Sequence, residues 1–491
     1  MSVSKQYAVH ADWLLGVNDS KPTIFRNRYV VIEGNEIVAI TDTKPASSEL
    51  VAEGGEMLIM PGFINLHNHC SSSVMFRGLS EDMPTIKSNE FPIDLVYGLL
   101  MPFNAAAINL LNGEETRAIF ELGLLEVIKG GTTTLMEQFR MGQQGTFEAA
   151  DKMGLRFYGM PYLMSHAPIG VRKDGVPEYQ TVSDFESLIS EWQEIYYALD
   201  KSENDLLRIG LGPHGTDTCD AELMRRIREL ANEHNCLITI HLSQTKSEEE
   251  LIKKRYGMTP TEYLDNTGLL GSDLLAAHCI FASNDDLKLL RKRKVTVANC
   301  PLTFGRGGVT APYHKFSDLG LRTVIGTDGY RMDIVGETRA AALVSKLHAG
   351  KAYITSVYEL INAVTIDAAD FLIRPDLGRI IPGARADLIG IELAKPHLQP
   401  VSDPLKTFLW NADRADVSLV MVDGQVLVKD SVFQLKDEDE IIRKGVHAVK
   451  RVWEEVHSKS IVDDHFFANW YKGKKNIKNT EVNKRTKNRK I

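Results

Sequence analysis

The chain has 491 residues, 43% of them hydrophobic and 25% charged, and its formal net charge is -8. This composition excludes extensive disorder, and the length favours two domains over a single core. The negative charge excludes a general positive field for nucleic acid or anionic lipid, so we expect a small-molecule substrate and neither a nucleic-acid nor a membrane partner.

The five cysteines are widely spread and include no CxxC pair, so neither a zinc ribbon nor a redox motif is indicated. The first 17 residues lack the basic region and long apolar core of a secretory signal. No uninterrupted apolar run reaches the roughly 18 residues of a membrane helix. We therefore expect a cytoplasmic protein without a membrane span.

The N-terminal region is rich in short β-type runs separated by turn residues, which predicts strands at 24–32 and 36–40. The next elements in the chain are eight brief apolar runs that alternate with amphipathic stretches, as in repeated βα units. The candidate strands are 58–66, 133–136, 156–163, 207–211, 237–240, 274–277, 295–298 and 323–325. Eight is the number that a closed parallel barrel needs, so we predict an α/β fold with a (β/α)8 TIM-like barrel over 59–375. Amphipathic helices are predicted at 222–233 and 284–292.

The β-type pattern returns near the C-terminus, where Asp423-Gly424 separates apolar runs at 417–422 and 425–428. Asp-Gly between apolar runs is a strong hairpin signal. We predict a small β-sandwich domain built from both chain ends, from 1–58 and 376–435.

The last segment, 436–491, is predicted to be a C-terminal helix at 437–457 followed by a basic tail. An aromatic patch of Phe466, Phe467, Trp470 and Tyr471 lies between them. We interpret the tail as a solvated terminus and assign it no function.

His67 and His69 directly follow the first barrel strand, and alternate residues of an extended strand point to the same face. Two imidazoles on one side of a strand end can bind one metal ion. Taken alone this pair is weak support, because histidines at strand ends are often surface residues.

Four more predicted strands are followed by a residue that can bind a metal ion, a histidine or an aspartate. His214, His241, His278 and Asp328 come after the strands at 207–211, 237–240, 274–277 and 323–325. The carboxyl ends of barrel strands converge on the face that carries the active site. Chance placement of the whole set is improbable, so the pattern predicts a metal-dependent active site.

Five segments are similar to the amidohydrolase superfamily, in the branch of methylthioadenosine/adenosylhomocysteine deaminases, guanine deaminases and chlorohydrolase-like triazine hydrolases. They are Pro61-Gly62-Phe63-Ile64-Asn65-Leu66-His67-Asn68-His69, Gly131-Thr132-Thr133-Thr134, Gly212-Pro213-His214, Ala277-His278-Cys279 and Gly326-Thr327-Asp328-Gly329. The resemblance implies one divalent metal ion, usually zinc and sometimes iron, held by His67, His69, His241 and Asp328. Such a site leaves one position for a water that becomes hydroxide near neutral pH.

The resemblance also implies further roles. Asp328 would take the proton of the water and pass it to the leaving group, while His278 would orient the attacking oxygen. His214 matches a position that reaches the substrate in related deaminases, and a structural role for it is equally open. Relatives of this kind are often homodimers or larger, so we expect a homo-oligomer.

The family usually has His-x-x-Glu where this chain has His241-Leu242-Ser243-Gln244. Glutamine donates a hydrogen bond but cannot deliver a proton. Glu137 could serve as the acid instead, although a supporting or surface role is equally open. Otherwise the substrate needs no ring protonation, or the chain is catalytically inactive, which fits poorly with the intact ligand set.

Two loops also depart from the family. Thr303-Phe304 replaces the usual Ser-Asn and alters the pocket wall, and Tyr330 and Arg331 follow the metal-binding Asp328. These last two could bind a flat or anionic substrate, or they are loop residues without a role.

We therefore predict a hydrolase that uses a metal-bound hydroxide to deaminate a cyclic amidine or N-heteroaromatic small molecule, releasing ammonia or an amine. The first alternative is hydrolysis of an exocyclic amide, urea, carbamate or carbon–halogen bond on a similar substrate. The second is a non-catalytic metal-binding scaffold.

Overall fold

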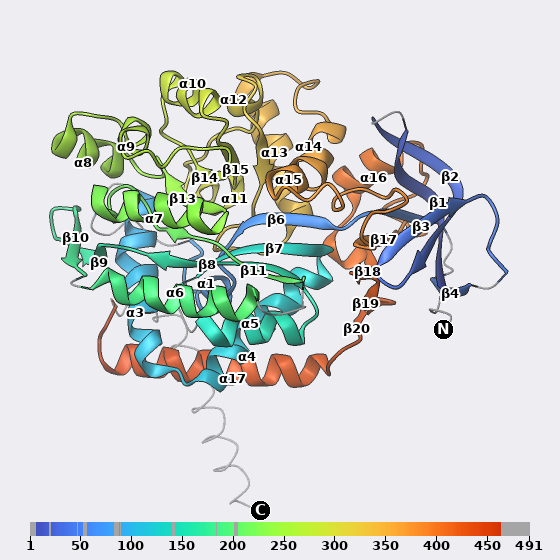
Figure 1. The fold of residues 1–491 in the computed structure, drawn as a ribbon, viewed down its shortest axis with the longest axis horizontal. Coiled ribbons are helices and arrows are strands. Elements are labelled where there is room, and N and C mark those ends of the chain that lie inside the picture. Colours follow the sequence, from blue (N-terminus) through green and yellow to red (C-terminus); the bar gives the residue numbers. More distant parts are fainter. Residues whose placement is uncertain are drawn as a thin grey trace, which may run out of the picture.

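The computed structural model describes residues 6–18, 21–46, 48–52, 56–82, 88, 90–139, 143–182, 184–200 and 205–462. A β-sheet built from both ends of the described chain lies beside a larger body of parallel strands and helices (Figure 1). The predicted aromatic patch and basic tail lie outside the described residues.

One nine-stranded sheet contains strands from both chain ends, in the order β20-β19-β18-β17-β5-β1-β2-β3, with β4 beside β1. Its strands are β1 (Gln6–Asn18), β2 (Lys21–Glu33), β3 (Glu36–Thr41), β4 (Glu49–Ala52), β5 (Met57–Pro61), β17 (Leu388–Glu392), β18 (Val417–Val422), β19 (Gln425–Lys429) and β20 (Val432–Phe433). The predicted assembly from both ends is present, because β5 pairs with β1 on one side and with β17 on the other. These strands form a single sheet, so the predicted sandwich is not confirmed.

The predicted strand at 58–66 is two strands that belong to different sheets. β5 lies in the small sheet, whereas β6 (Phe63–Asn68) pairs in parallel with β7 (Thr132–Phe139). Gly62 lies between them, and a Cβ atom there would be 2.1 Å from Thr133 Cγ2. Only glycine fits this crossing, and the continuous apolar run hides it in the sequence.

The parallel strands of the middle region form two sheets, in the orders β11-β8-β7-β6, with β12 beside β8, and β13-β14-β15-β16. Their bounds are β8 (Arg156–Leu163), β11 (Leu207–Ile209), β12 (Gly212–Pro213), β13 (Ile238–Leu242), β14 (Leu274–His278), β15 (Thr296–Asn299) and β16 (Thr323–Ile325). Isolated parallel bridges join Asn68 to Asp328 and Leu211 to Ile238, at the edges of these sheets. Each of the eight predicted strands overlaps a parallel strand, but the pairing does not form one continuous closed barrel.

Apolar side chains from six of these strands form one buried cluster. Its members include Ile64, Leu66, Met136, Tyr158, Met160, Leu275, Ala277, Ala298 and Val324, together with Ala368 and Phe371 of α15 (Ile366–Phe371). The space enclosed by the strands is therefore a packed core, and polar site residues are left to the strand ends.

Helices cover the parallel sheets and separate their strands in the sequence (Figure 1). Those before the second sheet are α1 (Cys70–Met75), α2 (Phe91–Ile93), η1 (Asp94–Leu100), α3 (Met101–Leu110), α4 (Gly113–Lys129), α5 (Gln143–Lys152), α6 (Phe185–Asp200) and α7 (Ala221–His234). Those that follow are α8 (Lys246–Tyr256), α9 (Pro260–Asn266), α10 (Asn284–Lys292), α11 (Pro301–Gly305), α12 (His314–Ser317), α13 (Ile334–Ala349), α14 (Val357–Ala363), α16 (Pro404–Asn411), η2 (Arg414–Asp416) and α17 (Glu438–Ser458).

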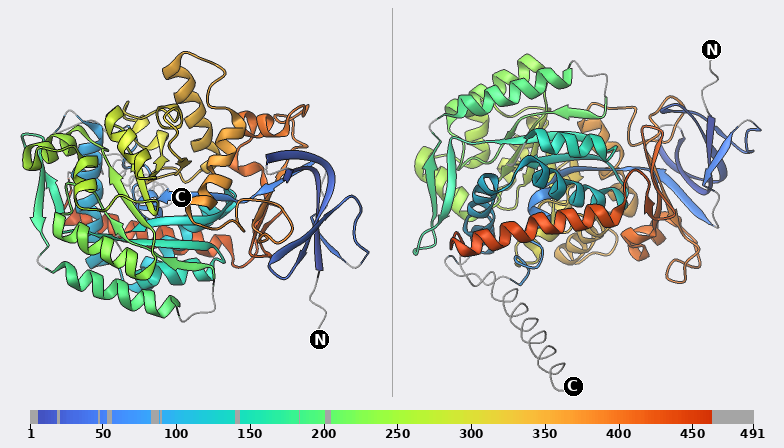
Figure 2. Two further views of the ribbon diagram at one scale, coloured as in Figure 1. Left: turned by 45° about the horizontal axis from the view of Figure 1, so that its top comes forward. Right: turned by 90° about the horizontal axis from the view of Figure 1, so that it is seen from below.

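The helices predicted from amphipathic periodicity are confirmed as α7, α10 and α17. α10 begins directly after Ser283, whose side chain forms a reciprocal capping box with Asp286. α17 packs along α4, where Gly445 leaves room for Leu122, and it runs along the underside of the molecule (Figure 2).

The segment Phe91–Leu110 was not predicted. By length and composition it could cross a membrane, contrary to our expectation, but 67% of its 18-residue apolar window is buried inside the protein. It contacts α17 and the hairpin strand β9 (His166–Val171), which pairs with β10 (Pro177–Thr181). It includes the π-helical turn η1, a feature common near functional sites.

Candidate active site

The strand ends bring together the residues that the sequence singled out. Ring nitrogens of His67, His69 and His241 lie within 4.8 Å of one another, and so do ligand atoms of His67, His278 and Asp328. All five side chains are buried. They come from β6, the residue after it, β13, β14 and the loop after β16, so the parallel strands place them at a common edge.

Two of the histidines, His69 and His241, face each other through their Nε2 atoms. His69 Nδ1 lies 2.7 Å from the carbonyl oxygen of Gln138, and His241 Nδ1 lies 2.7 Å from that of His214. A carbonyl only accepts, so each Nδ1 carries the proton and each neutral ring has a lone pair on Nε2. The two Nε2 atoms are 3.2 Å apart. Two lone pairs at this distance repel unless a proton or a metal ion lies between them, so the pair offers two ligand atoms to a metal ion.

Five other nitrogen and oxygen atoms of the cluster lack hydrogen-bond partners among the described residues. Both ring nitrogens of His67 and of His278, and Oδ2 of Asp328, are buried without a hydrogen bond. Asp328 Oδ1 lies 3.2 Å from His69 Nε2. Each unsatisfied buried polar group costs about 1–3 kcal/mol. Imidazoles and a carboxylate in this arrangement fit a divalent metal ion, which would use these atoms as ligands.

The protonation states also suit a metal site. Burial, reinforced by the nearby His69, holds the pKa of His67 well below its usual value. Burial and then His214 lower the pKa of His241 in the same way. Burial alone would raise the pKa of Asp328, but the neighbouring histidines hold it well below the usual range. Burial alone would lower the pKa of His69, but its hydrogen bond to Asp328 raises it, so a metal ion would displace a proton from this ring. Neutral imidazoles and an ionised carboxylate are the forms that bind metal.

Several strand ends at the site have left-handed backbone conformations. Positive φ angles occur at Ser243 (50°), His278 (74°), Cys279 (47°) and Asp328 (54°). Such conformations in residues other than glycine cost about 1–3 kcal/mol each and cluster at functional sites. The fold therefore maintains strain where it positions His278 and Asp328.

Glu137 supports the metal-binding strand and does not line the metal pocket. Its carboxylate accepts hydrogen bonds from the Cys70 backbone N–H and from Asn68 Nδ2, both at 2.6 Å. Burial raises the pKa of Glu137 to about 8. These contacts fix the backbone on both sides of His69, so they favour the supporting role over that of a general acid.

The same network reaches the loop that carries Asp328. Thr327 Oγ1 donates to Asn68 Oδ1 at 2.8 Å and accepts from Asn65 Nδ2 at 2.7 Å. The histidine-bearing strand and the aspartate-bearing loop are thereby joined by buried side chains. This arrangement fixes the positions of the ligands relative to each other.

A cavity of about 40 Å³ opens onto the ligand cluster. It is lined by His69, Ser72, Leu95, Val96, Leu100, Met101, Asn104, Tyr162, His214, His241, Gln244, His278, Thr303, Phe304, Asp328 and Gly329. Gln244 Nε2 is buried, with no hydrogen-bond partner in the part of the chain that the structure describes. His214 Nδ1 lies 3.0 Å from Thr218 Oγ1.

The sequence missed several of these pocket residues. Tyr162 is close to the carboxyl end of the predicted strand at 156–163. The expectation that site residues lie at the carboxyl ends of strands, which identified the histidines, could also have identified Tyr162. The apolar residues and Asn104 of the segment Phe91–Leu110 gave no signal of their position. Thr303 and Phe304, which depart from the family pattern, do line the pocket wall as expected.

Tyr330 and Arg331 were predicted to contact the substrate, but they lie outside this cavity. They line a neighbouring pocket that shares Gly329 with it. Arg331 is half-exposed and pairs with Asp333 at 2.9 Å, and the Arg306 guanidinium lies 4.1 Å from the Tyr330 ring centroid. The chain turns away from the metal cluster after Gly329, which the sequence could not reveal.

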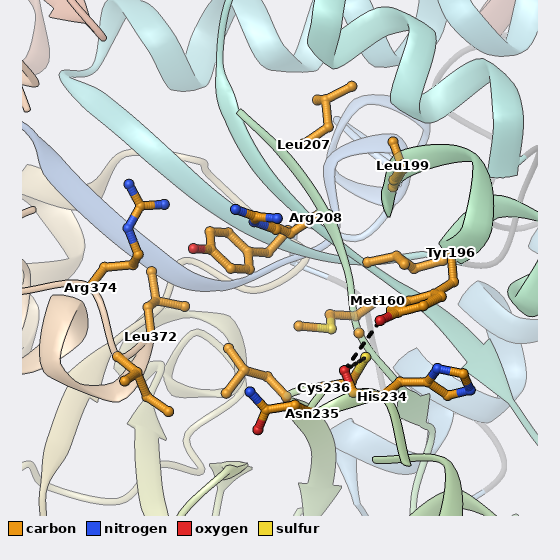
Figure 3. Close-up of a pocket in the computed structure, with 15 residues that line it drawn as sticks. Met160, Tyr196, Leu199, Leu207, Arg208, His234, Asn235, Cys236, Leu372 and Arg374 are labelled. Atoms are coloured by element: carbon orange, nitrogen blue, oxygen red, sulfur yellow. Dashed lines mark hydrogen bonds between the residues drawn. The ribbon is translucent and has the colours of Figure 1, made fainter. Parts of the chain in front are cut away.

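A separate pocket of about 350 Å³ lies near the beginnings of β8, β11 and β13 (Figure 3). Tyr196 Oη and Cys236 Sγ both donate to the carbonyl oxygen of His234 there. None of the predicted site residues lines this pocket. Because active sites of such barrels lie at the carboxyl ends of the strands, it is not a second candidate for the active site.

The fold and the ligand cluster define a metal-dependent hydrolase with a TIM-barrel-type fold. The amidohydrolase family model matches residues 58–427, so the chain belongs to the amidohydrolase family. The resemblance inferred from the sequence motifs is therefore confirmed.

The relatives agree with this assignment. A 5-methylthioadenosine/S-adenosylhomocysteine deaminase of Pyrococcus furiosus is 30% identical over 437 residues, which are 86% of this chain and 95% of that protein. A 5'-deoxyadenosine deaminase of Methanopyrus kandleri is 27% identical, over 89% of this chain and 98% of that protein. The chain is thus a hydrolytic enzyme of the deaminase group that acts on carbon–nitrogen bonds.

Solved structures share the fold. An adenosine deaminase from Xanthomonas campestris with bound zinc superposes with a TM-score of 0.80 at 20% identity, covering 92% of this chain and 99% of that one. An atrazine chlorohydrolase from Arthrobacter aurescens TC1 in complex with zinc gives 0.79 at 22% identity, covering 90% of this chain and 100% of that one.

Proposed function

We propose that this chain is a zinc-dependent deaminase that replaces the amino group of a cyclic amidine or N-heteroaromatic small molecule with oxygen. The observation that carries the proposal is the buried cluster in which the Nε2 lone pairs of His69 and His241 face each other beside Asp328. Water is consumed and ammonia, or an amine, is released. The relatives' names support this substrate class, because 5-methylthioadenosine and 5'-deoxyadenosine both carry an amino group on a purine ring.

His67, His69, His241 and Asp328 would hold the ion, which when bound supplies Lewis acidity and lowers the pKa of water. Within the described ranges of the chain, Asp328 Oδ2 has no hydrogen-bond partner, and it lies 3.6 Å from His278 Nε2. The carboxylate can therefore accept the proton of the attacking water and pass it to the leaving group. His278 can orient the attacking oxygen, and His214 lies on the pocket wall, where it can contact the substrate.

Gln244 gives weight to a second candidate function. Its buried Nε2 has no partner among the described residues, so it can donate to an acceptor on the substrate but cannot protonate it. Such a site suits a bond whose leaving group departs without ring protonation: an exocyclic amide, urea, carbamate or carbon–halogen bond. A non-catalytic scaffold is the third alternative.

Product analysis separates these functions. Purified protein, supplied with zinc, is incubated with aminated purines, pyrimidines, pterins and triazines and, separately, with matched amides, ureas, carbamates and chlorinated rings. Release of ammonia or an amine from the aminated heterocycles supports the proposal. Release only from the second group supports the second candidate, and no turnover by a zinc-loaded protein favours a scaffold.

We also propose the finer structural and cellular assignments. The bridges between the two parallel sheets support closure into a barrel of eight strands. Zinc as the ion is supported by its presence in the similar structures. The homo-oligomeric state and the cytoplasmic location stay predictions.

A further inference from the structure

A second pocket, of about 270 Å³, lies directly beside the metal pocket. It is lined by Ser73, Phe76, Arg77, Ser80, Glu81, Glu126, Gly329, Tyr330, Arg331 and Arg414. Gly329 lines both pockets, and Ser72 and Ser73 of α1 line one each. A single ligand could therefore reach from one pocket to the other past Gly329, which has no side chain to block the way.

The charge of this second pocket is dominated by arginine. The side chains of Arg77, Arg331 and Arg414 are 53%, 51% and 38% exposed. Glu126 forms ion pairs with both Arg77 and Arg414, so one carboxylate serves two guanidinium groups. A guanidinium has five N–H donors, and these pairs leave donors for a further acceptor.

Arg306 lines neither pocket, but it contacts two residues that line the second pocket, Ser80 and Tyr330. It stacks on the Tyr330 ring and donates from Nη1 to Ser80 Oγ and from Nε to the Thr303 carbonyl oxygen, both at 3.0 Å. Among the described residues no carboxylate lies within ion-pair distance of it, and its Nη2 is buried without a partner. A largely buried cation without a counter-ion is costly, and a bound anion would offset that cost.

The balance of charge around the pocket is therefore positive, in a chain whose formal net charge is -8. Three arginines and the carboxylates of Glu81 and Glu126 line the pocket. Outside the lining, Arg331 pairs with Asp333, and Arg306 stacks on Tyr330. A local excess of guanidinium groups with serine hydroxyls beside them suits a carboxylate or a phosphate.

We propose that this arginine pocket is an anion subsite for the substrate: it binds a carboxylate or phosphate substituent while the reacting ring lies in the metal pocket. The proposal deepens the proposed function and rests on it. It assigns the substrate to a class, that of aminated heterocycles with an anionic side chain.

The first test needs no turnover. Calorimetric titration with inorganic phosphate compares the zinc-loaded wild type with the double variant Arg77→Gln/Arg331→Gln. Arg208→Gln is the matched control, because Arg208 is also 51% exposed and lies at the pocket of Figure 3. We expect phosphate to bind the wild type and the control, with affinity reduced about 10- to 100-fold in the double variant. Absence of phosphate binding to the wild type would overturn the proposal.

The second test uses pairs of aminated heterocycles that differ only by a carboxylate or phosphate. The double variant should raise KM for the anionic member about 10- to 100-fold and leave the neutral member within about twofold. Phosphate should compete with the anionic member. Equal effects on both members, or phosphate binding that does not compete, would show a separate anion site and contradict the proposal. If the double variant loses phosphate binding but the wild type turns over no heterocycle, the anion site stands and the proposed function is refuted.

Discussion

Replacing Gln244 by leucine should make the free protein more stable and the enzyme slower. Gln244 Nε2 is buried in the metal pocket, where no described residue accepts a hydrogen bond from it, and leucine has a similar size but no donor. Removing an unsatisfied buried donor stabilises a protein by about 1–3 kcal/mol. If the same donor binds the substrate in the transition state, its loss lowers kcat/KM by about 5- to 150-fold, since 1.4 kcal/mol corresponds to tenfold.

The assay measures both effects on one variant. The free energy of unfolding is obtained from denaturant titration of the zinc-loaded protein, and kcat/KM from product release with the best substrate of the panel. A Gln244→Leu variant that is less stable than the wild type, or one that keeps kcat/KM within twofold, would refute the argument.

A glutamate at the same position tests the missing acid. Gln244→Glu places a carboxyl group in a buried pocket, and burial raises the pKa of such a group. The carboxyl donates a hydrogen bond only while protonated, so kcat/KM of the variant should fall as pH rises through that pKa. The wild type has no titrating group there and should lack this step. Identical pH profiles of the two proteins would contradict a substrate contact at this position.

Three further predictions follow from the residues around the site. Glu137→Ala removes the hydrogen bonds that support the residues beside His69, so it should weaken zinc binding about 10- to 100-fold, measured by chelator competition. If zinc affinity is unchanged and the variant's pH profile of kcat/KM loses an acid step, Glu137 is the acid instead. Gly326→Ala places a Cβ atom 2.6 Å from His67 Cβ and should lower zinc affinity. The control Gly113→Ala should not, because no described atom beyond its chain neighbours lies within 4 Å of the added Cβ. Equal zinc affinities of the two variants would contradict this. Burial, and then the charge of Asp217, raise the folded-state pKa of Glu248 from 4.5 to about 8. The protonated Glu248 side chain therefore contributes stability that is complete below pH 4.5 and is lost as pH rises through about 8. Tm should fall more between pH 6 and 9 in the wild type than in Glu248→Gln. Parallel curves of Tm against pH for the two proteins would contradict this.

The sequence was most informative where a local rule has a direct spatial consequence. The predicted strands at 156–163 and 323–325 match β8 and β16 residue for residue. Parallel strands place their carboxyl ends at one edge, so His241, His278 and Asp328 could be brought together without coordinates. The spacing of His67 and His69 worked for the same reason.

Other features depend on contacts that no local pattern encodes. Gly62 separates two strands only because Thr133 packs against it. The apolar segment Phe91–Leu110 lines the pocket through its place in the tertiary structure, not through periodicity. For Glu137 the sequence left an acid and a supporting role open, and only the structure shows that its carboxylate is directed to Asn68 and Cys70 and that it does not line the cavity.

The most direct test of the metal-dependent active site is zinc content and activity measured on the same preparations. Wild type, Asp328→Ala and the control Asp285→Ala, whose side chain is 90% exposed on α10, are purified with zinc, analysed for bound metal and assayed for ammonia release. We predict about one equivalent of zinc and ammonia release in the wild type and control, and loss of activity with weakened zinc binding in Asp328→Ala. Wild-type protein without stoichiometric metal, or full activity in Asp328→Ala, would contradict the account.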